Sequence, residues 1–400
     1  MGLSPFSTHA ADAVSKWMRR GSYPKRSPLN RPSKQVVRDL CDKIAHAKER
    51  AKRMIASPRD VRRWFIKADR AQKLSGGTRF LPTHIKDHVT QYVTRYLVYT
   101  FRIGGRRVNI RFAVYGSLGK TPFDRMAERV LSWLLVCSKI TRSTTCSTKL
   151  DIFFLRAPFE KRLPKSDTEV LGPNHVNSGY ATSCAKHGEM VIFRREEWFK
   201  VLIHESFHAF GFDLGAADLE DVSRSVLKVD ASHAIYEAYT ETWARMINVF
   251  YCALDSPKSV RQKMVEELLG VECIFSVIQA AKVLDHMGTD YQCLLSGNDC
   301  GYTEKTNVLA YYVITAALLS DMNSFLGWCS KYAEGFLRFP VRPKPREAFA
   351  NLLIRALRQP KYIDELHSSI GWPGTRVSKK VDLAMTMRMT CIDCNEDAEN

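Results

Sequence analysis

The chain of 400 residues lacks any long hydrophobic run. Its longest apolar stretch, Val308 to Leu319, is interrupted by Thr315 and is shorter than the roughly 20 residues that a membrane-spanning helix needs. The N-terminal residues also contain no apolar segment of the kind that directs secretion. These absences predict a soluble protein that has no membrane span and is not secreted.

The cysteines form no recognisable framework. There are 11 of them, an odd number, without a repeating spacing, which argues against a small disulfide-stapled extracellular protein. The pair Cys391 and Cys394 is a lone CxxC near the end of the chain. We therefore expect free thiols and a reducing, intracellular location such as the cytoplasm, the nucleus or a virion.

Acidic residues are too few to balance the basic ones, which leaves a formal net charge of +18. Residues 1–76 hold 19 Lys and Arg against 6 Asp and Glu, a local excess of 13, so the remainder contributes only +5. A basic arm of this kind predicts a polyanionic partner, either nucleic acid, an anionic membrane face or an acidic protein. The alternatives are a solvated helical surface and a targeting signal.

Hydrophobic periodicity predicts four regions. Residues 1–76 form the arm, flexible to residue 33 and then helical, and it ends at Ser75-Gly76-Gly77. Residues 77–214 contain a hairpin around Gly104-Gly105, and 215–390 are helical, followed by a tail over 391–400. The predicted fold class is α+β, a small mixed sheet with one central helix followed by a mostly helical subdomain. The expected strands are 96–103, 108–115, 149–155 and 189–195, and the expected helices are 34–56, 59–74, 122–140, 196–210, 230–253, 258–286, 303–325, 345–357 and 378–388.

The most informative segment is an apolar stretch that contains His204-Glu205-Ser206-Phe207-His208. Residues four apart lie on one face of a helix, so both imidazoles can bind one zinc ion. Glu205 then projects beside the metal and can act as a base toward water. The alternative is a pair of hydrogen-bonded core histidines.

A third ligand is needed, because two histidines alone hold zinc poorly. Glu237 and Glu241 also lie four apart, within a helix flanked by Tyr, Trp and Ala. One carboxylate can bind the metal while the other accepts the free N–H of a liganding histidine. We favour Glu237 as the ligand and Glu241 as its supporting acid. The reverse assignment and a solvated helix face are the alternatives.

This pattern resembles the gluzincin branch of the zincin metallopeptidases, in which HExxH on one helix is followed by a glutamate ligand on the next long helix. The resemblance covers roughly 78–325. It implies that 77–214 is the N-terminal zincin subdomain with the HExxH helix, and that 215–390 is the helical C-terminal one. Zn2+ is the implied cofactor, and a peptide or protein is the implied substrate.

Two further sets of site residues accompany the resemblance. The strand before the HExxH helix matches the edge strand on which zincins hold an extended peptide. An additional donor should stabilise the tetrahedral oxyanion, with ordinary packing as the alternative role for each candidate. The edge-strand residues are Glu189, Val191 and Phe193, and the candidate donors are Tyr311, Tyr312 and His233.

A neighbouring branch and a viral group share parts of the pattern. His208-Ala209-Phe210-Gly211 resembles the metzincin extension HExxHxxGxxH, but Leu214 stands at the third-ligand position and Asp213 is one residue away. The stretch from Leu163 to Phe212 is similar to uncharacterised zincin-like proteins of large nucleocytoplasmic DNA viruses. Within it, Asn177-Ser178-Gly179 and Glu196-Glu197-Trp198 carry that similarity.

The predicted function is zinc-dependent hydrolysis of peptide bonds. Zinc polarises the scissile carbonyl and acidifies a water, while Glu205 takes the proton and passes it to the leaving amine. The alternative is a non-catalytic structural or packaging protein of zincin fold that binds nucleic acid through its basic arm. An intact Glu205 favours the enzyme, because a scaffold needs the ligands but not the base.

Overall fold

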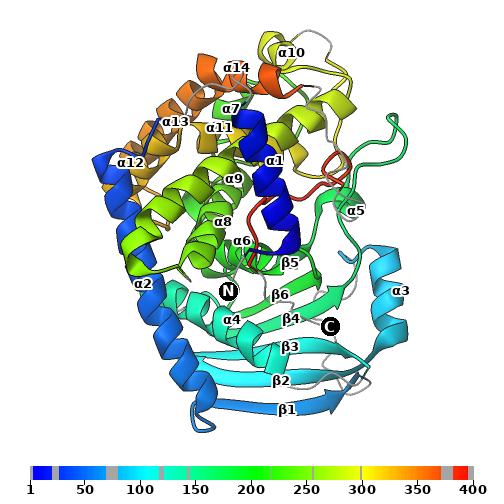
Figure 1. The fold of residues 1–400 in the computed structure, drawn as a ribbon, viewed down its shortest axis with the longest axis vertical. Coiled ribbons are helices and arrows are strands. Elements are labelled where there is room, and N and C mark those ends of the chain that lie inside the picture. The colour runs from blue at the N-terminus through cyan, green and yellow to red at the C-terminus, as the bar shows by residue number, and fades with distance from the viewer. Residues whose placement is uncertain are drawn as a thin grey trace. The chain divides into compact units, whose positions relative to one another are not determined.

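In the computed structural model, the chain divides into two compact units (Figure 1). The sheet unit comprises Asp39–Glu160, Ser178–Phe212 and Glu396–Asn400. The helical unit comprises Met1–Arg38, Lys161–Asn177 and Asp213–Asn395. The structure describes residues 3–19, 27–68, 80–116, 121–141, 145–216, 218–254, 256–297, 300–370 and 382–394.

The sheet unit is built on one mixed sheet of six strands, in the order β1-β2-β3-β4-β6-β5 (Figure 1). β3, β4 and β6 run parallel to one another, and the other neighbouring pairs are antiparallel. An α+β protein with a mixed sheet is therefore confirmed. The strands are β1 Val61–Lys67, β2 Val93–Ile103, β3 Arg106–Tyr115, β4 Lys149–Ala157, β5 Gly179–Ala181 and β6 His187–Arg194.

Alternating side chains give the sheet two different faces. On one face an aromatic layer packs under α4 (Thr121–Ile140) and α6 (Trp198–Phe210), with the rings of Phe112 and Phe154 4.9 Å apart. Phe123 of α4 and Trp198 of α6 extend this layer. On the other face, α3 (Thr83–Tyr92) covers one end of the sheet through Ile85 and neighbouring apolar residues.

The β2–β3 hairpin turns at Gly104 and Gly105, as predicted. Their φ angles of +49° and +79° lie in the left-handed region, which favours glycine. The predicted helices over 122–140 and 196–210 and the strands over 149–155 and 189–195 are also present, with ends shifted by a few residues.

The helical unit has α8 and α9, which contact each other, in its interior. Helix α2 runs through the boundary between the units, which lies after Arg38. The helices are α1 Pro5–Arg19, α2 Arg31–Ala56, α5 Pro173–Val176, η2 Leu214–Ala216, α7 Glu220–Arg224, α8 Ile235–Ala253, α9 Lys258–His286, α10 Tyr291–Ser296, the π-helix η3 Leu309–Ile314, α11 Thr315–Ser320, α12 Met322–Tyr332, α13 Pro343–Leu357 and α14 Pro360–Ser369.

Several N-terminal predictions are wrong. The predicted helix over 59–74 is instead β1, whose Val61 pairs with Phe101 of β2, so strand pairing overrides the local helical pattern. The predicted flexible segment 1–33 contains α1, whose Ala10 and Val14 are buried. Residues 39–67 consequently belong to the sheet unit, and not to a separate arm.

C-terminal predictions differ as well. The single helix expected over 303–325 is three shorter helices, η3, α11 and α12. Of the helix expected over 378–388, residues 382–388 are not helical, and 378–381 lie outside the described residues. Residues 391–394, expected to be part of a tail, are largely buried.

The prediction of free thiols is wrong for six of the 11 cysteines, since five are free. Cys146 pairs with Cys184 in the sheet unit, while Cys252–Cys394 and Cys293–Cys300 are disulfides of the helical unit. The first two close loops of 38 and 142 residues, which no local spacing reveals. The reducing compartment inferred from free thiols therefore loses its support.

Among the described residues, no single helix is long and apolar enough to cross a bilayer. One helix pair, Leu309–Ser320 with Met322–Tyr332, reaches the required length and apolar composition only when both helices are taken together, and it is bent by 87°.

Candidate metal centre

Helix α6 carries the HExxH segment in the sheet unit. It follows β6 after Glu197, which adopts a left-handed conformation, and it ends at Gly211, whose φ of +66° closes the helix as predicted. All its residues except His208 are buried. The two histidines and the glutamate are therefore held on a helix that packs against the sheet and cannot rotate freely.

The imidazoles of His204 and His208 converge. Their Nε2 atoms lie 3.1 Å apart and their ring centroids 4.9 Å apart. This confirms that spacing of four residues places both rings on one face of α6. A hydrogen bond between the two rings fits this distance, and so does shared binding of one ion.

Glu205 lies against the backbone of β5. A Cβ atom at residue 179 would lie 2.9 Å from Oε1 of Glu205 and 2.7 Å from Cγ1 of Val201, so only glycine fits there. Glu205 is 6% exposed. Gly179 thus allows the strand to approach the carboxylate of Glu205 closely.

Polar contacts within the sheet unit anchor α6. Trp133 of α4 donates to Oγ of Ser206 at 2.6 Å, and Ser147 donates to the carbonyl of Ala209 at 2.8 Å. The backbone N–H of Cys184, itself disulfide-bonded to Cys146, donates to the carbonyl of His208. The helix turn that carries the second histidine is therefore tied to two neighbouring segments.

The predicted edge strand is not at the edge. β6, with Glu189, Val191 and Phe193, is paired with β4 on one side and with β5 on the other. Gly179–Ala181 is too short and too mixed in composition for its strand to be seen in the sequence. Because β5 occupies the outer hydrogen-bonding groups of β6, an extended peptide cannot pair there unless β5 moves.

In the helical unit, Glu237 lies in the first turn of α8 and is 8% exposed. The side-chain amide of Asn307 donates to its Oε1 at 3.3 Å. Glu241, one turn later, is fully buried and pairs with Arg245, whose Nε lies 2.9 Å from its Oε1. The two acids thus have different surroundings within one helix.

Arg245 is the residue that sequence reasoning missed. Its remaining donors reach Oγ of Ser276 at 2.6 Å and the carbonyl of Tyr311 at 2.7 Å. The spacing of four residues from Glu241 was a visible signal for this ion pair. Arg245 therefore links α8 to α9 and to η3.

The three candidate oxyanion donors differ in availability. The hydroxyl of Tyr312 donates to the carbonyl of Met387 at 2.7 Å. Both ring nitrogens of His233 have partners, Ser223 and the carbonyl of Val229, and burial lowers the pKa of this imidazole. Tyr311 is partly buried and packs against the apolar cluster that contains Tyr312 and Met387.

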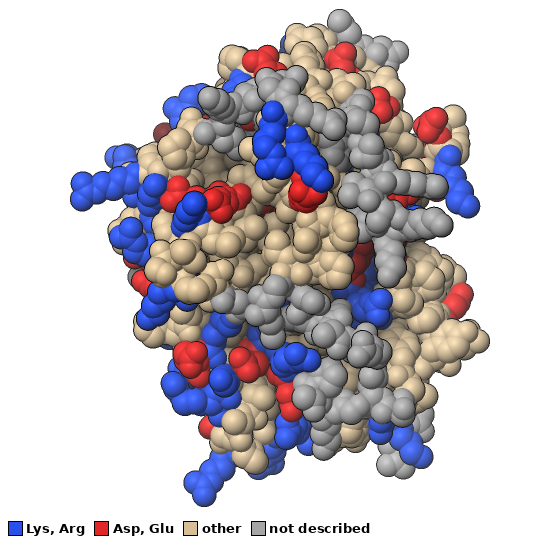
Figure 2. All heavy atoms as spheres, in the orientation of Figure 1, with Lys and Arg blue, Asp and Glu red and all other residues tan. Residues whose placement is uncertain are grey.

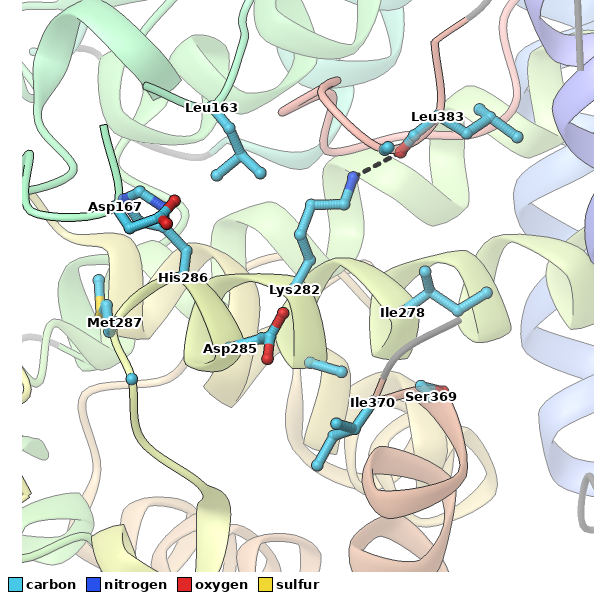
Figure 3. Close-up of a pocket in the computed structure, with 13 residues that line it drawn as sticks. Leu163, Asp167, Ile278, Lys282, Asp285, His286, Met287, Ser369, Ile370 and Leu383 are labelled. Carbon is cyan, nitrogen blue, oxygen red and sulfur yellow. Dashed lines mark hydrogen bonds between the residues drawn. The ribbon is translucent and has the colours of Figure 1, made fainter. Parts of the chain in front are cut away.

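A pocket of about 580 Å³ lies elsewhere in the helical unit (Figure 3). Lys282 of α9 points from its wall toward the segment after residue 381 and donates to the carbonyls of Leu383 and Thr386 at 2.7 and 2.8 Å. Burial lowers the pKa of Lys282 to about 7, against the opposing charge of Asp382. No sequence motif marked this lysine, and its contacts indicate that it holds the turn at 382–386.

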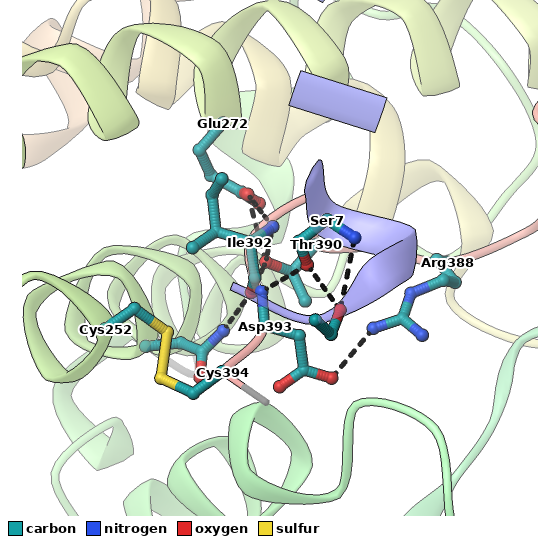
Figure 4. Close-up of a disulfide and its surroundings, with 10 residues drawn as sticks. Ser7, Cys252, Glu272, Arg388, Thr390, Ile392, Asp393 and Cys394 are labelled. Carbon is teal, nitrogen blue, oxygen red and sulfur yellow. Dashed lines mark hydrogen bonds and ion pairs between the residues drawn. A yellow bond between two sulfur atoms is a disulfide. The ribbon is translucent and has the colours of Figure 1, made fainter. Parts of the chain in front are cut away.

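Glu272 of α9 anchors the C-terminal segment (Figure 4). Its Oε2 accepts from the hydroxyl of Thr390 and from the backbone N–H groups of Cys391 and Ile392 at 2.9 to 3.1 Å. The Cys252–Cys394 disulfide ties the same segment to α8. Burial raises the pKa of Glu272 to about 7, although these donors and the charge of Arg245 lower it.

Comparison of the chain with protein-family models, with curated proteins and with solved structures finds no match. The sheet unit brings together His204, Glu205 and His208, and the helical unit carries Glu237, Glu241 and the candidate donors.

Proposed function

We propose that the chain is a zinc-dependent peptidase of zincin-like fold, with His204, His208 and Glu237 as metal ligands and Glu205 as the base. The observation that carries the proposal is the convergence of the two Nε2 atoms to 3.1 Å beside a buried glutamate. Two nitrogens bound tetrahedrally to one zinc at 2.0–2.1 Å lie about 3.3 Å apart. The donor set thus fits zinc.

The third ligand completes the proposed site. In the arrangement that we propose, His204, His208 and Glu237 each contribute one ligand atom to a single ion. Glu241 is a weaker choice as ligand, because Arg245 already engages its carboxylate in a fully buried ion pair. Two neutral histidines and one carboxylate form a set that catalytic zinc sites use.

When bound, zinc supplies a Lewis acid that polarises a carbonyl and acidifies water. Glu205 accepts a proton from the attacking water and delivers it to the departing amine. Its carboxylate is desolvated and lies beside Gly179 of β5. Tyr311 is the proposed donor to the oxyanion.

The test compares Glu205→Gln with wild type on a fluorogenic peptide library, with zinc content measured on the same samples. Removing the base while keeping its shape should lower hydrolysis by about 10²-fold or more. Zinc content should not change, because Glu205 is not a ligand. Glu49→Gln, an exposed acid on α2, is the matched control and should retain full activity.

A second candidate is a closed metal centre without catalysis, as in a structural or packaging protein. It is favoured by one observation, that β5 fills the outer edge of β6 and presses Gly179 against Glu205. In that case wild type binds zinc but hydrolyses no peptide, and Glu205→Gln changes neither property.

A further inference from the structure

A row of basic side chains crosses four strands of the sheet. Cross-strand register places Arg102 opposite Arg107, Arg107 opposite Lys149, and Lys149 opposite His187. All four residues are exposed. With about 4.8 Å between strands, the row is roughly 14 Å long.

The row is on the face of the sheet that α3 covers only in part. Tyr96, on the same face as Arg102, packs in the apolar cluster under α3 at the other end of the strands. The alternating pattern therefore continues from a covered apolar end to an exposed basic end. α4 and α6 pack on the opposite face, so neither of them contacts the row.

Like charges directly opposite one another weaken a sheet. Within the described ranges, none of these four residues has an ion pair or a side-chain hydrogen bond. Nearby acids do not neutralise them: Asp151 is paired with Arg111 and Asn109, and Glu189 is buried. A row of basic side chains that weakens the sheet and is not neutralised by described residues indicates a binding site for an anionic ligand.

The same face offers an aromatic group. Trp64 of β1 pairs with Val98 and so points to the side of the sheet that carries Arg102, and its side chain is 42% exposed. Arg62, which pairs with Thr100, stands exposed between Trp64 and the row. Exposed aromatics beside a basic track are the combination that binds single-stranded nucleic acid, because bases stack on the ring while cations contact phosphates.

We infer that this face of the sheet, defined by Arg62, Trp64 and the row Arg102–Arg107–Lys149–His187, binds single-stranded nucleic acid. Lys and Arg side chains are also frequent at the left and lower edges of Figure 2, where Figure 1 places α2 and β1. The basic row on the sheet differs from the basic side chains on α2 because cross-strand pairing fixes the spacing of its residues. The inference is independent of the metal centre.

The experiment measures fluorescence anisotropy of a labelled 20-nucleotide oligo-dT on the full chain between 50 and 200 mM salt. Phosphate contacts from the four exposed cations Arg62, Arg102, Arg107 and Lys149 predict a slope of log affinity against log salt of about −2.8. Arg107→Gln/Lys149→Gln should halve this slope and weaken binding at least tenfold at 50 mM salt. Trp64→Ala should weaken binding about fivefold or more, with the slope unchanged.

The matched control is Arg50→Gln/Arg53→Gln, which removes the same charge from exposed positions of α2. Its affinity should stay within twofold of wild type. Equal losses in both double variants, or a loss in the α2 variant alone, would overturn the inference in favour of general charge or of the N-terminal basic region. Absence of binding to oligo-dT would also overturn it, and sedimentation with phosphatidylserine vesicles would then assign the row to an anionic membrane.

Discussion

Two interior regions differ in composition: the layer between the sheet and helices α4 and α6 is aromatic, whereas the contact of α8 with α9 contains buried charged groups. Under α4 and α6 the sheet is covered by packed rings: Phe112 stacks on Phe154, and Tyr99 meets Phe112 edge-on. Between α8 and α9 the helical unit buries the Glu241–Arg245 ion pair and the carboxylate of Glu272, each with several hydrogen bonds. An aromatic layer tolerates small changes of shape, whereas a buried charge is costly as soon as its partner is lost.

This difference bears on the proposed centre, because its parts come from both interiors. The histidines and Glu205 are held by the packing of α6, and Glu237 lies on the helix that carries the Glu241–Arg245 pair. We therefore expect the helical unit to be the more sensitive to single polar substitutions.

The largest effect is expected for Arg245→Met. Glu241 would stay fully buried without its partner, which costs about 3–5 kcal/mol. Urea unfolding measures the loss of unfolding free energy. The control is Arg358→Met, at the exposed C-cap of α13. Glu241→Gln/Arg245→Met should recover at least half of the loss. If Arg245→Met were as stable as the control, the Glu241–Arg245 pair would not be needed for stability.

Removal of the Cys252–Cys394 disulfide should cost about 2–5 kcal/mol, since it closes a loop of 142 residues. Urea unfolding of Cys252→Ala/Cys394→Ala under non-reducing conditions measures this effect. Cys391→Ala removes a buried free thiol from the same segment and should lower the free energy of unfolding by less than the double variant does. Equal unfolding midpoints for wild type and the double variant would contradict the disulfide.

A smaller effect should depend on pH through Glu272. Because its folded pKa, about 7, exceeds the ordinary 4.5, the folded state binds the proton more tightly, and the stability this provides is lost as pH rises toward 7. Relative to Glu272→Gln, wild type should lose roughly 2.5 kcal/mol of unfolding free energy between pH 5 and pH 8. A difference that stays constant with pH, or grows, would contradict the raised pKa.

Local signals explain why much of the sheet unit was predictable. Gly104-Gly105 fixed the hairpin, Gly211 marked the end of α6, and the spacing of His204 and His208 predicted their convergence. The strands that were not predicted in the sheet unit, β1 and β5, form through pairing with residues that are distant in the sequence. β1 has a pattern that also suits a helix, and β5 is only three residues long.

The helical unit was predictable in its long helices but not in its connections. α9 has the predicted bounds, 258–286. The contacts of Glu272 with Thr390, Cys391 and Ile392 join residues about 120 positions apart, and no periodicity in the sequence encodes them. The Glu241–Arg245 pair is the exception, because opposite charges four residues apart within one helical segment can be recognised in the amino-acid sequence.

The most direct test of the proposed centre is elemental analysis of zinc in purified wild type, His208→Ala, Glu237→Ala and Glu205→Gln, each checked for folding. We expect about one zinc per chain in wild type and in Glu205→Gln, and loss of nearly all zinc from the two ligand variants. Folded wild type without zinc, or full zinc content in Glu237→Ala, would contradict it.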